Sequence, residues 1–192
     1  MSKPQRKGNL FIISGPSGAG KGTLVKELQS RVPDVWVSVS ATTRQPRAGE
    51  VEGKSYYFRS TEEFKDLIKN EGLLEYSQHF SHYYGTPLEP VLAHIEDGKQ
   101  VILEIDVEGA LQVQKKAPYA CLIFIEPPSV QELRRRLEER GTESPQQIEE
   151  RISRVNKELA LKTRYNHVIV NDNLNSACVE LVSLIDTYAH RQ

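Results

Sequence analysis

The stretch SGPSGAGKGTL at residues 14–24 constrains this chain more than any other part of its sequence. The residues from Gly15 to Lys21 fit the phosphate-loop pattern up to its lysine. An apolar run at residues 10–13 precedes the stretch and predicts a buried strand, and apolar residues recur at helical spacing after it. A glycine-rich turn between a strand and a helix directs backbone N–H groups and the positive end of the helix at an anion. The stretch therefore predicts a binding site for a nucleoside triphosphate.

Gly22 departs from this pattern, which usually has a Ser or Thr whose hydroxyl binds Mg²⁺. Glycine has no such group, and the next hydroxyl along the chain belongs to Thr23. We therefore expect a Mg²⁺ ion held mainly by phosphates and waters, which this ion tolerates well, with no protein side chain as its direct ligand. The residues expected around the phosphates are Gly15, Ser17, Gly18, Ala19, Gly20, Lys21, Gly22 and Thr23.

The rest of the chain alternates between apolar runs and helical patterns. Further buried strands are predicted at residues 35–39, 101–105, 121–125 and 167–170. Ser129 with Glu132 forms a capping-box pattern for a helix that ends at Gly141, and Ser144 starts another that reaches about residue 161. A last helix is expected at about residues 176–189. Strands that alternate with helices predict an α/β fold with a parallel sheet covered on both faces.

Composition limits the class of protein. The 192 residues suit one domain, or one core with an inserted lobe. A net charge of −1, from 25 basic and 26 acidic residues, argues against a nucleic-acid coat or a membrane-surface protein. Cys121 and Cys178 lack metal-site spacing, so we expect two buried or semi-buried free thiols. No signal peptide or membrane span is evident in the sequence, and we expect a cytoplasmic protein.

Two polar segments interrupt the alternation. Residues 38–87 are rich in Ser, Thr, Tyr, Arg and Gly, and we interpret them as a lobe inserted into a core formed by residues 1–37 and 88–192. The second segment is dense in arginine and predicts a lid at about residues 134–155. His79 and His82 lack further ligands for a metal site, and we expect them at the surface.

The inserted lobe carries the chemistry of an acceptor site. Arg44 and Arg47 stand three residues apart, and the hydroxyls of Tyr56 and Tyr84 follow. Two guanidinium groups and two phenols suit a monophosphate. A carboxylate such as Glu75, with small hydroxyls nearby, suits a base that has N–H donors. Guanine offers donors at N1 and N2, whereas adenine has no N1–H, so these residues favour a guanine nucleotide.

With these motifs in order, the sequence resembles the guanylate kinases, which phosphorylate GMP. The resemblance runs from about residue 9 to residue 189 and rests on SGPSGAGK, SVSATTRQPRAGE, YYGT, IDVEG, PPS and VND. It implies a P-loop NTPase-type parallel sheet with helices on both faces, an inserted mixed GMP-binding lobe and an arginine-bearing helical lid. It also implies Mg²⁺-dependent transfer of the γ-phosphoryl group of ATP to GMP, giving ADP and GDP.

The resemblance also implies roles for individual residues. The phosphate of GMP would be held by Arg44, Arg47, Tyr56 and Tyr84, and the guanine edge by Ser40, Glu75 and Thr86. Asp106 would lie between the nucleotides, and Asn171 and Asp172 near the base of ATP. The catalytic cations would be Lys21, Arg47, Arg140 and Arg151, with Arg136 as a helper. The family usually has Asp at the position of Glu104 and Gln at that of Glu108.

Two alternatives remain open at this stage. One is a kinase for AMP or a pyrimidine nucleotide. The other is a binding module, because guanylate-kinase-like domains of scaffold proteins share this fold without the activity. The presence of Lys21, Arg44 and Arg47 favours the enzyme. We expect GMP, dGMP and ATP as its small-molecule partners, and neither nucleic acid nor membrane; the sequence leaves the oligomeric state open.

Overall fold

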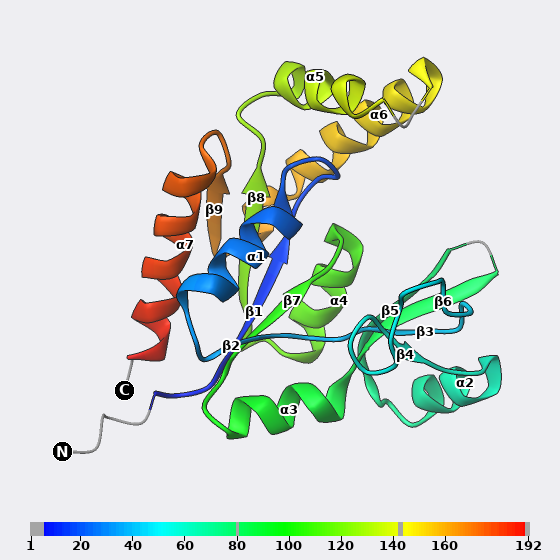
Figure 1. The fold of residues 1–192 in the computed structure, drawn as a ribbon. Coiled ribbons are helices and arrows are strands. Elements are labelled where there is room, and N and C mark those ends of the chain that lie inside the picture. Colours follow the sequence, from blue (N-terminus) through cyan, green and yellow to red (C-terminus); the bar gives the residue numbers. More distant parts are fainter. Residues whose placement is uncertain (1–5, 80, 142–143, 191–192) are drawn as a thin grey trace.

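The computed structural model describes residues 6–79, 81–141 and 144–190, without the side chain of Arg140. Its larger sheet has five parallel strands in the order β2-β7-β1-β8-β9 (Figure 1). These strands are β1 (Asn9–Ser14), β2 (Val35–Val37), β7 (Gln100–Glu104), β8 (Cys121–Glu126) and β9 (His167–Val170). The predicted parallel sheet is confirmed, although β2 ends at Val37, two residues earlier than expected.

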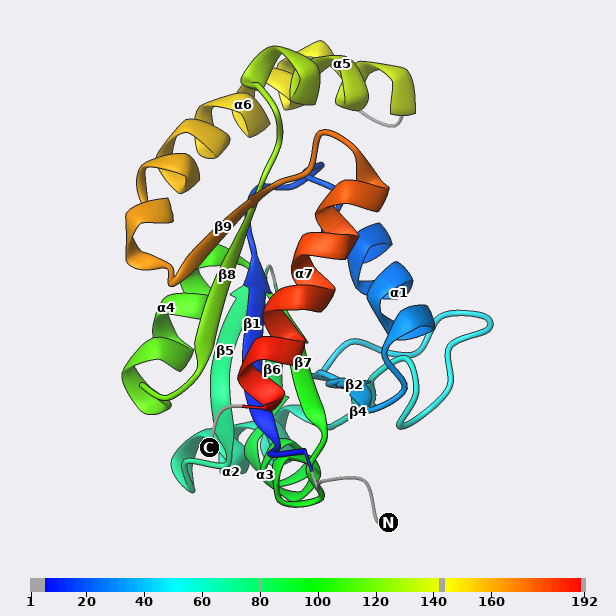
Figure 2. The same ribbon diagram turned by 90° about the vertical axis from the view of Figure 1, so that its left-hand side faces the viewer.

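Helices cover both faces of this sheet, as predicted. On one face lie α1 (Lys21–Arg31) and α7 (Leu174–Ala189), and on the other α3 (Leu88–Glu96) and α4 (Val107–Lys116) (Figure 2). Alternate residues of β1 enter the two cores, because Phe11 and Ile13 face α1 whereas Leu10 and Ile12 face α4. A strand buried on both sides therefore has an unbroken apolar run. Cys121 and Cys178 are buried free thiols, as predicted.

A second, mixed sheet has the order β4-β3-β6-β5. Its strands are β3 (Ala41–Thr42), β4 (Tyr57–Phe58), β5 (Leu73–His79) and β6 (His82–Pro87), and α2 (Thr61–Lys69) packs against it through Phe64. The β3–β4 pair is parallel, and the pairs β3–β6 and β5–β6 are antiparallel. The mixed lobe is confirmed, while the division of the chain into domains at residues 38 and 87 stays a prediction.

The helices α5 (Val130–Arg140) and α6 (Pro145–Ala160) form a pair with its own small core, followed by the short helix η1 (Lys162–Arg164). The pair overhangs the carboxyl ends of the parallel strands (Figure 1). Ser144 and Gln147 form a reciprocal capping box. The box predicted at Ser129 is only half formed, because the carboxylate of Glu132 bonds Arg135 and Arg136 instead. Among the described helices, none is long and apolar enough to span a membrane.

Candidate active site

The phosphate loop connects β1 to α1 at the carboxyl edge of the large sheet. Gly15 has a φ of +140°, and a Cβ there would lie 2.2 Å from the carbonyl oxygen of Ile125, so only glycine fits. Gly20 caps α1 without a side chain, and the first turn of this helix holds no acidic residue. The N–H groups at this helix start therefore face an open position with a positive field, as an anion site requires.

The Lys21 ammonium folds back over the loop. Its Nζ donates hydrogen bonds to the carbonyl oxygens of Gly15 at 2.6 Å and Pro16 at 3.0 Å. Burial lowers the pKa of Lys21, and the carboxylates of Glu104, Glu158 and Asp106 act in the opposite direction. The cation is thus held by two loop carbonyls and lies within electrostatic range of three carboxylates.

Glu104 faces the place of the missing loop hydroxyl. It ends β7, directly beside Ile13 of β1. A Cβ added to Gly22 would lie 3.3 Å from Oε1 of Glu104, so this carboxylate occupies the space next to the glycine. Burial raises the pKa of Glu104, and the neighbouring Lys21 opposes that shift. Oxygen donors of this kind, with room for water, fit a Mg²⁺ ion carried by the phosphates.

Asn171 supports the loop from behind. Its side chain is buried, and Nδ2 donates to the carbonyl oxygen of Ala19 at 2.8 Å. A Cβ on Gly20 would lie 2.5 Å from the same nitrogen. Sequence reasoning assigned Asn171 to the ATP base and missed this backbone contact, which joins residues 152 positions apart. Asp172 and Thr23 are exposed.

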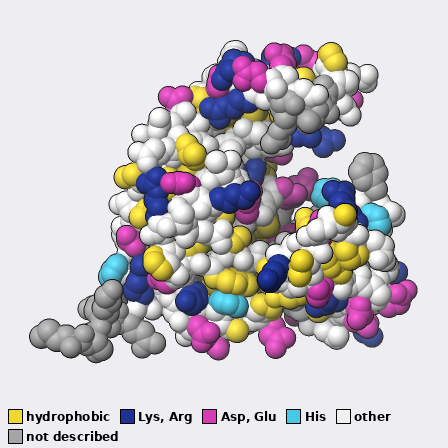
Figure 3. All heavy atoms as spheres, viewed as in Figure 1, with side chains coloured by type: hydrophobic (Ala, Val, Ile, Leu, Met, Phe, Trp, Pro, Cys, Tyr) yellow, Lys and Arg dark blue, Asp and Glu magenta, His cyan; other side chains and the backbone are white. Residues whose placement is uncertain are grey.

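The second sheet and the start of α4 enclose a cavity of about 590 Å³. Figure 3 shows a hollow between the lid pair and this sheet, with charged side chains on its walls. The cavity brings together seven of the eight predicted acceptor residues, namely Ser40, Arg44, Arg47, Tyr56, Glu75, Tyr84 and Asp106. The eighth, Thr86, donates its hydroxyl to Oε1 of Glu75 at 2.6 Å.

The inner end of the cavity is acidic, with a buried carboxylate at Glu75 and an exposed one at Asp106. Glu75 is 6% exposed, and burial raises the pKa of its carboxyl group. Asp106 caps α4, where its Oδ1 accepts the N–H of Gly109 at 2.7 Å. A Cβ on Gly109 would lie 3.0 Å from Glu75 and 3.3 Å from Asp106, so glycine lets the two carboxylates approach. Such an end suits a ring with several N–H donors.

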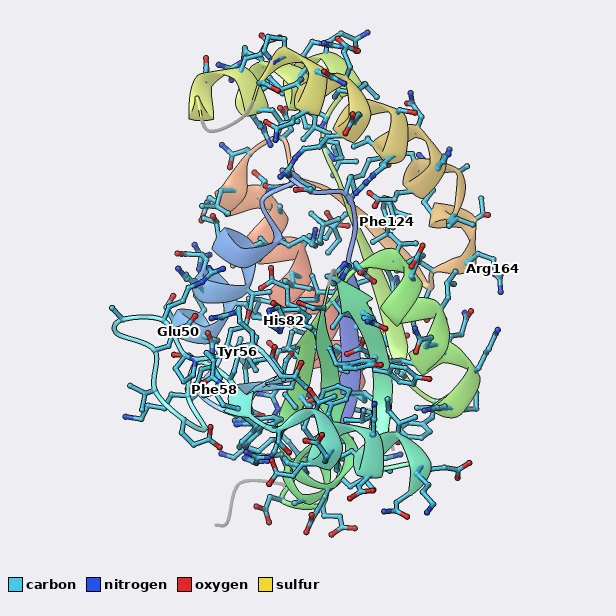
Figure 4. All side chains as sticks on the ribbon, turned by 90° about the vertical axis from the view of Figure 1, so that its right-hand side faces the viewer. Glu50, Tyr56, Phe58, His82, Phe124 and Arg164 are labelled. Atoms are coloured by element: carbon cyan, nitrogen blue, oxygen red, sulfur yellow. The ribbon has the colours of Figure 1, made fainter. Side chains whose placement is uncertain are left out.

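The outer end of the cavity is cationic and aromatic. The Arg44 guanidinium lies 5.3 Å from the ring centre of Tyr56, whose ring lies 6.2 Å from that of Tyr84. Glu50 accepts two hydrogen bonds from Arg44, at 2.9 and 2.8 Å, and one from the backbone N–H of Arg47 at 2.7 Å. These bonds lower the pKa of Glu50 to about 2, first through Arg44. Glu50 and Tyr56 are labelled in Figure 4.

The arginines of the lid differ in their surroundings. Arg151 Nη1 donates to Oγ of Ser17 in the phosphate loop at 2.6 Å, so α6 touches the loop directly. Arg136 pairs with Glu132 at 2.9 Å. Arg134 and Arg135 form exposed ion pairs with glutamates of the lid. The side chain of Arg140 lies outside the described residues, so its predicted role stays a prediction.

Sequence reasoning missed several residues of this site. Ser77, His79 and His82 line the cavity; His79 is exposed at the surface as expected and His82 is half-buried, but the sequence predicted no place for them in a site. The available signal for Ser77 and His79 was their alternation with Glu75 along β5, because alternate residues of a strand share a face; His82 lies opposite His79 on β6. Glu50 was quoted within a motif but given no role. Within the described residues, no group of three or more His, Cys, Asp or Glu side chains is arranged to hold a metal ion.

Comparisons with known proteins agree with this geometry. Residues 7–188 match the family model for guanylate kinases. A guanylate kinase of Caldanaerobacter subterraneus subsp. tengcongensis is 49% identical over 94% of this chain and 88% of its own length. A guanylate kinase of Gloeobacter violaceus is 51% identical over 90% of this chain and 84% of its own length. The crystal structure of guanylate kinase from Anaplasma phagocytophilum has a TM-score of 0.75 at 30% identity, covering 98% of this chain and 89% of that one.

Proposed function

The chain belongs to the guanylate kinase family, whose members transfer the γ-phosphoryl group of ATP to GMP and give GDP and ADP, and we propose that its loop, cavity and lid supply the residues for this reaction. One observation carries the assignment of the sites. The cavity holds an acidic end, where Glu75 is buried, and a cationic end, and its Asp106 lies close enough to Lys21 of the loop to affect that lysine's pKa. Acceptor and donor sites are therefore adjacent, as direct transfer requires.

The loop binds the phosphates of ATP. Every residue from 15 to 23 except Pro16 has a backbone N–H group, and these groups and the start of α1 contact the anion, while Lys21 exchanges its loop carbonyls for phosphate oxygens. Mg²⁺, held mainly by phosphates and waters, would neutralise part of their charge. Glu104, on the neighbouring strand, would hydrogen-bond waters of that ion. Asn171 keeps the loop in shape, and Asp172 lies beyond it, toward the base of ATP.

The cavity binds GMP, and we propose dGMP as a second acceptor. Arg44, Arg47, Tyr56 and Tyr84 bind its phosphate, with Glu50 fixing the orientation of Arg44. The guanine edge donates hydrogen bonds to the carboxylates of Glu75 and Asp106. Thr86 donates its hydroxyl to Glu75, and Ser40 offers a further hydroxyl to the guanine. The acceptor phosphate is already a nucleophile, so the residues position it and offset charge without a strong general base.

The lid closes over the two nucleotides. Arg151 reaches the loop through Ser17, which supports a role at the transferring phosphoryl group. Arg140 stands at the end of α5, and we propose that it joins Arg151 and Arg47 in stabilising the charge of the transition state. Closure also excludes water, whose attack would hydrolyse ATP. We propose that the enzyme acts in the cytoplasm.

The reaction itself is tested by ADP release from ATP with each of GMP, dGMP, AMP, CMP and UMP. We expect GMP to be the best acceptor, because Glu75 and Asp106 can accept both guanine donors. Activity should require Mg²⁺ and disappear with EDTA. A higher kcat/KM for AMP or UMP, or activity that EDTA leaves unchanged, would contradict the proposal.

The contact between Gly22 and Glu104 gives a second prediction, on metal binding. Gly22 is helical, so its backbone accepts serine, but a serine Cβ lies 3.3 Å from Oε1 of Glu104. We expect Gly22→Ser to be active and to displace that carboxylate. Glu104→Asp, one methylene shorter, should relieve the contact, so the double variant should bind metal more tightly than either single variant, with a coupling of about 1 kcal/mol.

The measurement is a Mn²⁺ titration of the ADP complex by electron paramagnetic resonance for wild type, both single variants and the double variant, with turnover measured alongside. Additive effects on Mn²⁺ affinity would show that Gly22 and Glu104 act independently. Loss of all binding in both Gly22→Ser proteins would mean that the loop needs the glycine itself.

A further inference from the structure

The β5–β6 hairpin presents three opposed pairs of residues to the acceptor cavity. Glu75 lies opposite Thr86, Ser77 opposite Tyr84, and His79 opposite His82. Because they alternate along the strands, the three pairs share one face. Five of these six residues line the cavity directly, and Thr86 binds Glu75. The histidine pair is therefore the outermost step of a ladder whose two inner steps already have roles.

The ladder runs from a buried to an exposed end. Glu75 and Thr86 are buried, Tyr84 and His82 are half-buried, and His79 is exposed. Tyr84, in the middle pair, lies at the cationic end of the cavity because it hydrogen-bonds Arg44. This bond raises the pKa of Arg44, after the larger effect of Glu50. The His79 ring centre lies 5.9 Å from that of Tyr84. His82, labelled in Figure 4 with Tyr56, lines the same cavity.

We propose that His79 and His82 complete the subsite for the acceptor phosphate, donating imidazole N–H groups to its oxygens and taking up protons as a nucleoside monophosphate dianion binds. This inference rests on the proposed function, because it assumes that the phosphate lies between Arg44 and Tyr84. It adds two residues to those assigned above, and it adds a dependence on pH that arginines and tyrosines do not provide near neutrality.

The charges around the two imidazoles determine the direction of this linkage. Arg44 and Arg47 line the same cavity as the histidines, together with Tyr56 and Tyr84, and Glu50 offsets the charge of Arg44. Glu75 and Asp106 lie toward the inner end. A phosphate dianion bound beside the two imidazoles favours their protonated form. Binding of the acceptor should therefore be coupled to proton uptake.

The test is isothermal titration of GMP into wild type, His79→Gln, His82→Gln and the double variant. Titrations near pH 7 in two buffers of different ionisation enthalpy count the protons taken up. Glutamine keeps an N–H donor but cannot be charged. His190→Gln is the matched control, because His190 is exposed at the end of α7.

We expect the double variant to take up fewer protons than wild type and to bind GMP about tenfold more weakly near pH 6, but less than about twofold more weakly near pH 8. The phosphate's own ionisation near pH 6 and that of Glu75 affect both proteins alike and cancel in the comparison. KM for GMP should rise while kcat at saturating GMP stays unchanged. His190→Gln should behave as wild type.

Equal proton uptake in wild type and the double variant, with affinities for GMP within about twofold near pH 6, would overturn the inference. So would an equal loss at both pH values accompanied by a lower melting temperature, because that marks a structural role. His79 is exposed, so its single variant gives a folded protein if the double variant does not. Failure of the wild type to prefer GMP over AMP would instead overturn the proposed function.

Discussion

Replacing Lys21 with methionine should lower turnover at least about a hundredfold, on the scale of losing one contact to the transition state. Lys21 is the one cationic side chain among residues 14–24. Its ammonium donates to the carbonyl oxygens of Gly15 and Pro16, in the loop proposed to bind the phosphates. Methionine keeps the length and the apolar stem of the side chain but removes the charge, so the developing negative charge on the transferred group loses its nearest cation.

The fold of this variant should survive. The two lost hydrogen bonds are worth about 1 kcal/mol each, and removing a desolvated charge offsets part of that cost. We would measure ADP release and the melting temperature, with Lys115→Met, an exposed position on α4, as the matched control. The control should keep wild-type turnover. A melting temperature of Lys21→Met far below that of both other proteins would make Lys21 a structural residue.

The large sheet could be predicted because its evidence is local. Strands buried on both faces appear as unbroken apolar runs, so the run at residues 121–125 marks β8 almost to the residue. The capping box at Ser144 and the glycine after Arg140 mark helix ends through bonds that span only a few residues. The phosphate loop is a contiguous motif, and β1 and α1 directly precede and follow it in the sequence.

The details of the site could be predicted less well because they depend on distant partners. Arg151 and Ser17 are 134 positions apart, and no pattern in the sequence joins them. At Ser129 the capping box is incomplete because the carboxylate of Glu132 forms ion pairs with Arg135 and Arg136 of the same helix. The two-residue strands β3 and β4 are too short to show periodicity, yet Ser40 and Tyr56, which directly precede them, line the cavity.

Glu75→Gln should reduce both the affinity for GMP and the preference for GMP over AMP. The buried carboxylate accepts from Thr86 and faces the end of the cavity assigned to guanine. A hydrogen bond to a charged group contributes about 1.5–3 kcal/mol, so KM for GMP should rise roughly ten- to hundredfold. Adenine places a lone pair where guanine has N1–H, so the charge also repels the wrong base. KM for ATP should change little.

The same substitution should stabilise the folded protein above a defined pH. Burial raises the pKa of Glu75 above its ordinary value of 4.5. An acid whose pKa is raised by folding costs stability as pH rises from the unfolded value through the folded one. Glutamine does not ionise and still accepts from Thr86. The free energy of unfolding of Glu75→Gln relative to wild type should therefore be constant below pH 4.5 and increase above it.

Two measurements check this prediction together: acceptor kinetics with GMP and AMP, and thermal melting at about pH 4 and about pH 8. Glu180→Gln, exposed on α7, is the matched control and should leave both unchanged. If Glu75 only supported the hairpin, its substitution would change melting without changing acceptor preference. If it were simply exposed to solvent, neither would change. A gain in stability together with a loss of guanine preference is expected only for a buried carboxylate that the substrate, when bound, provides with hydrogen-bond donors.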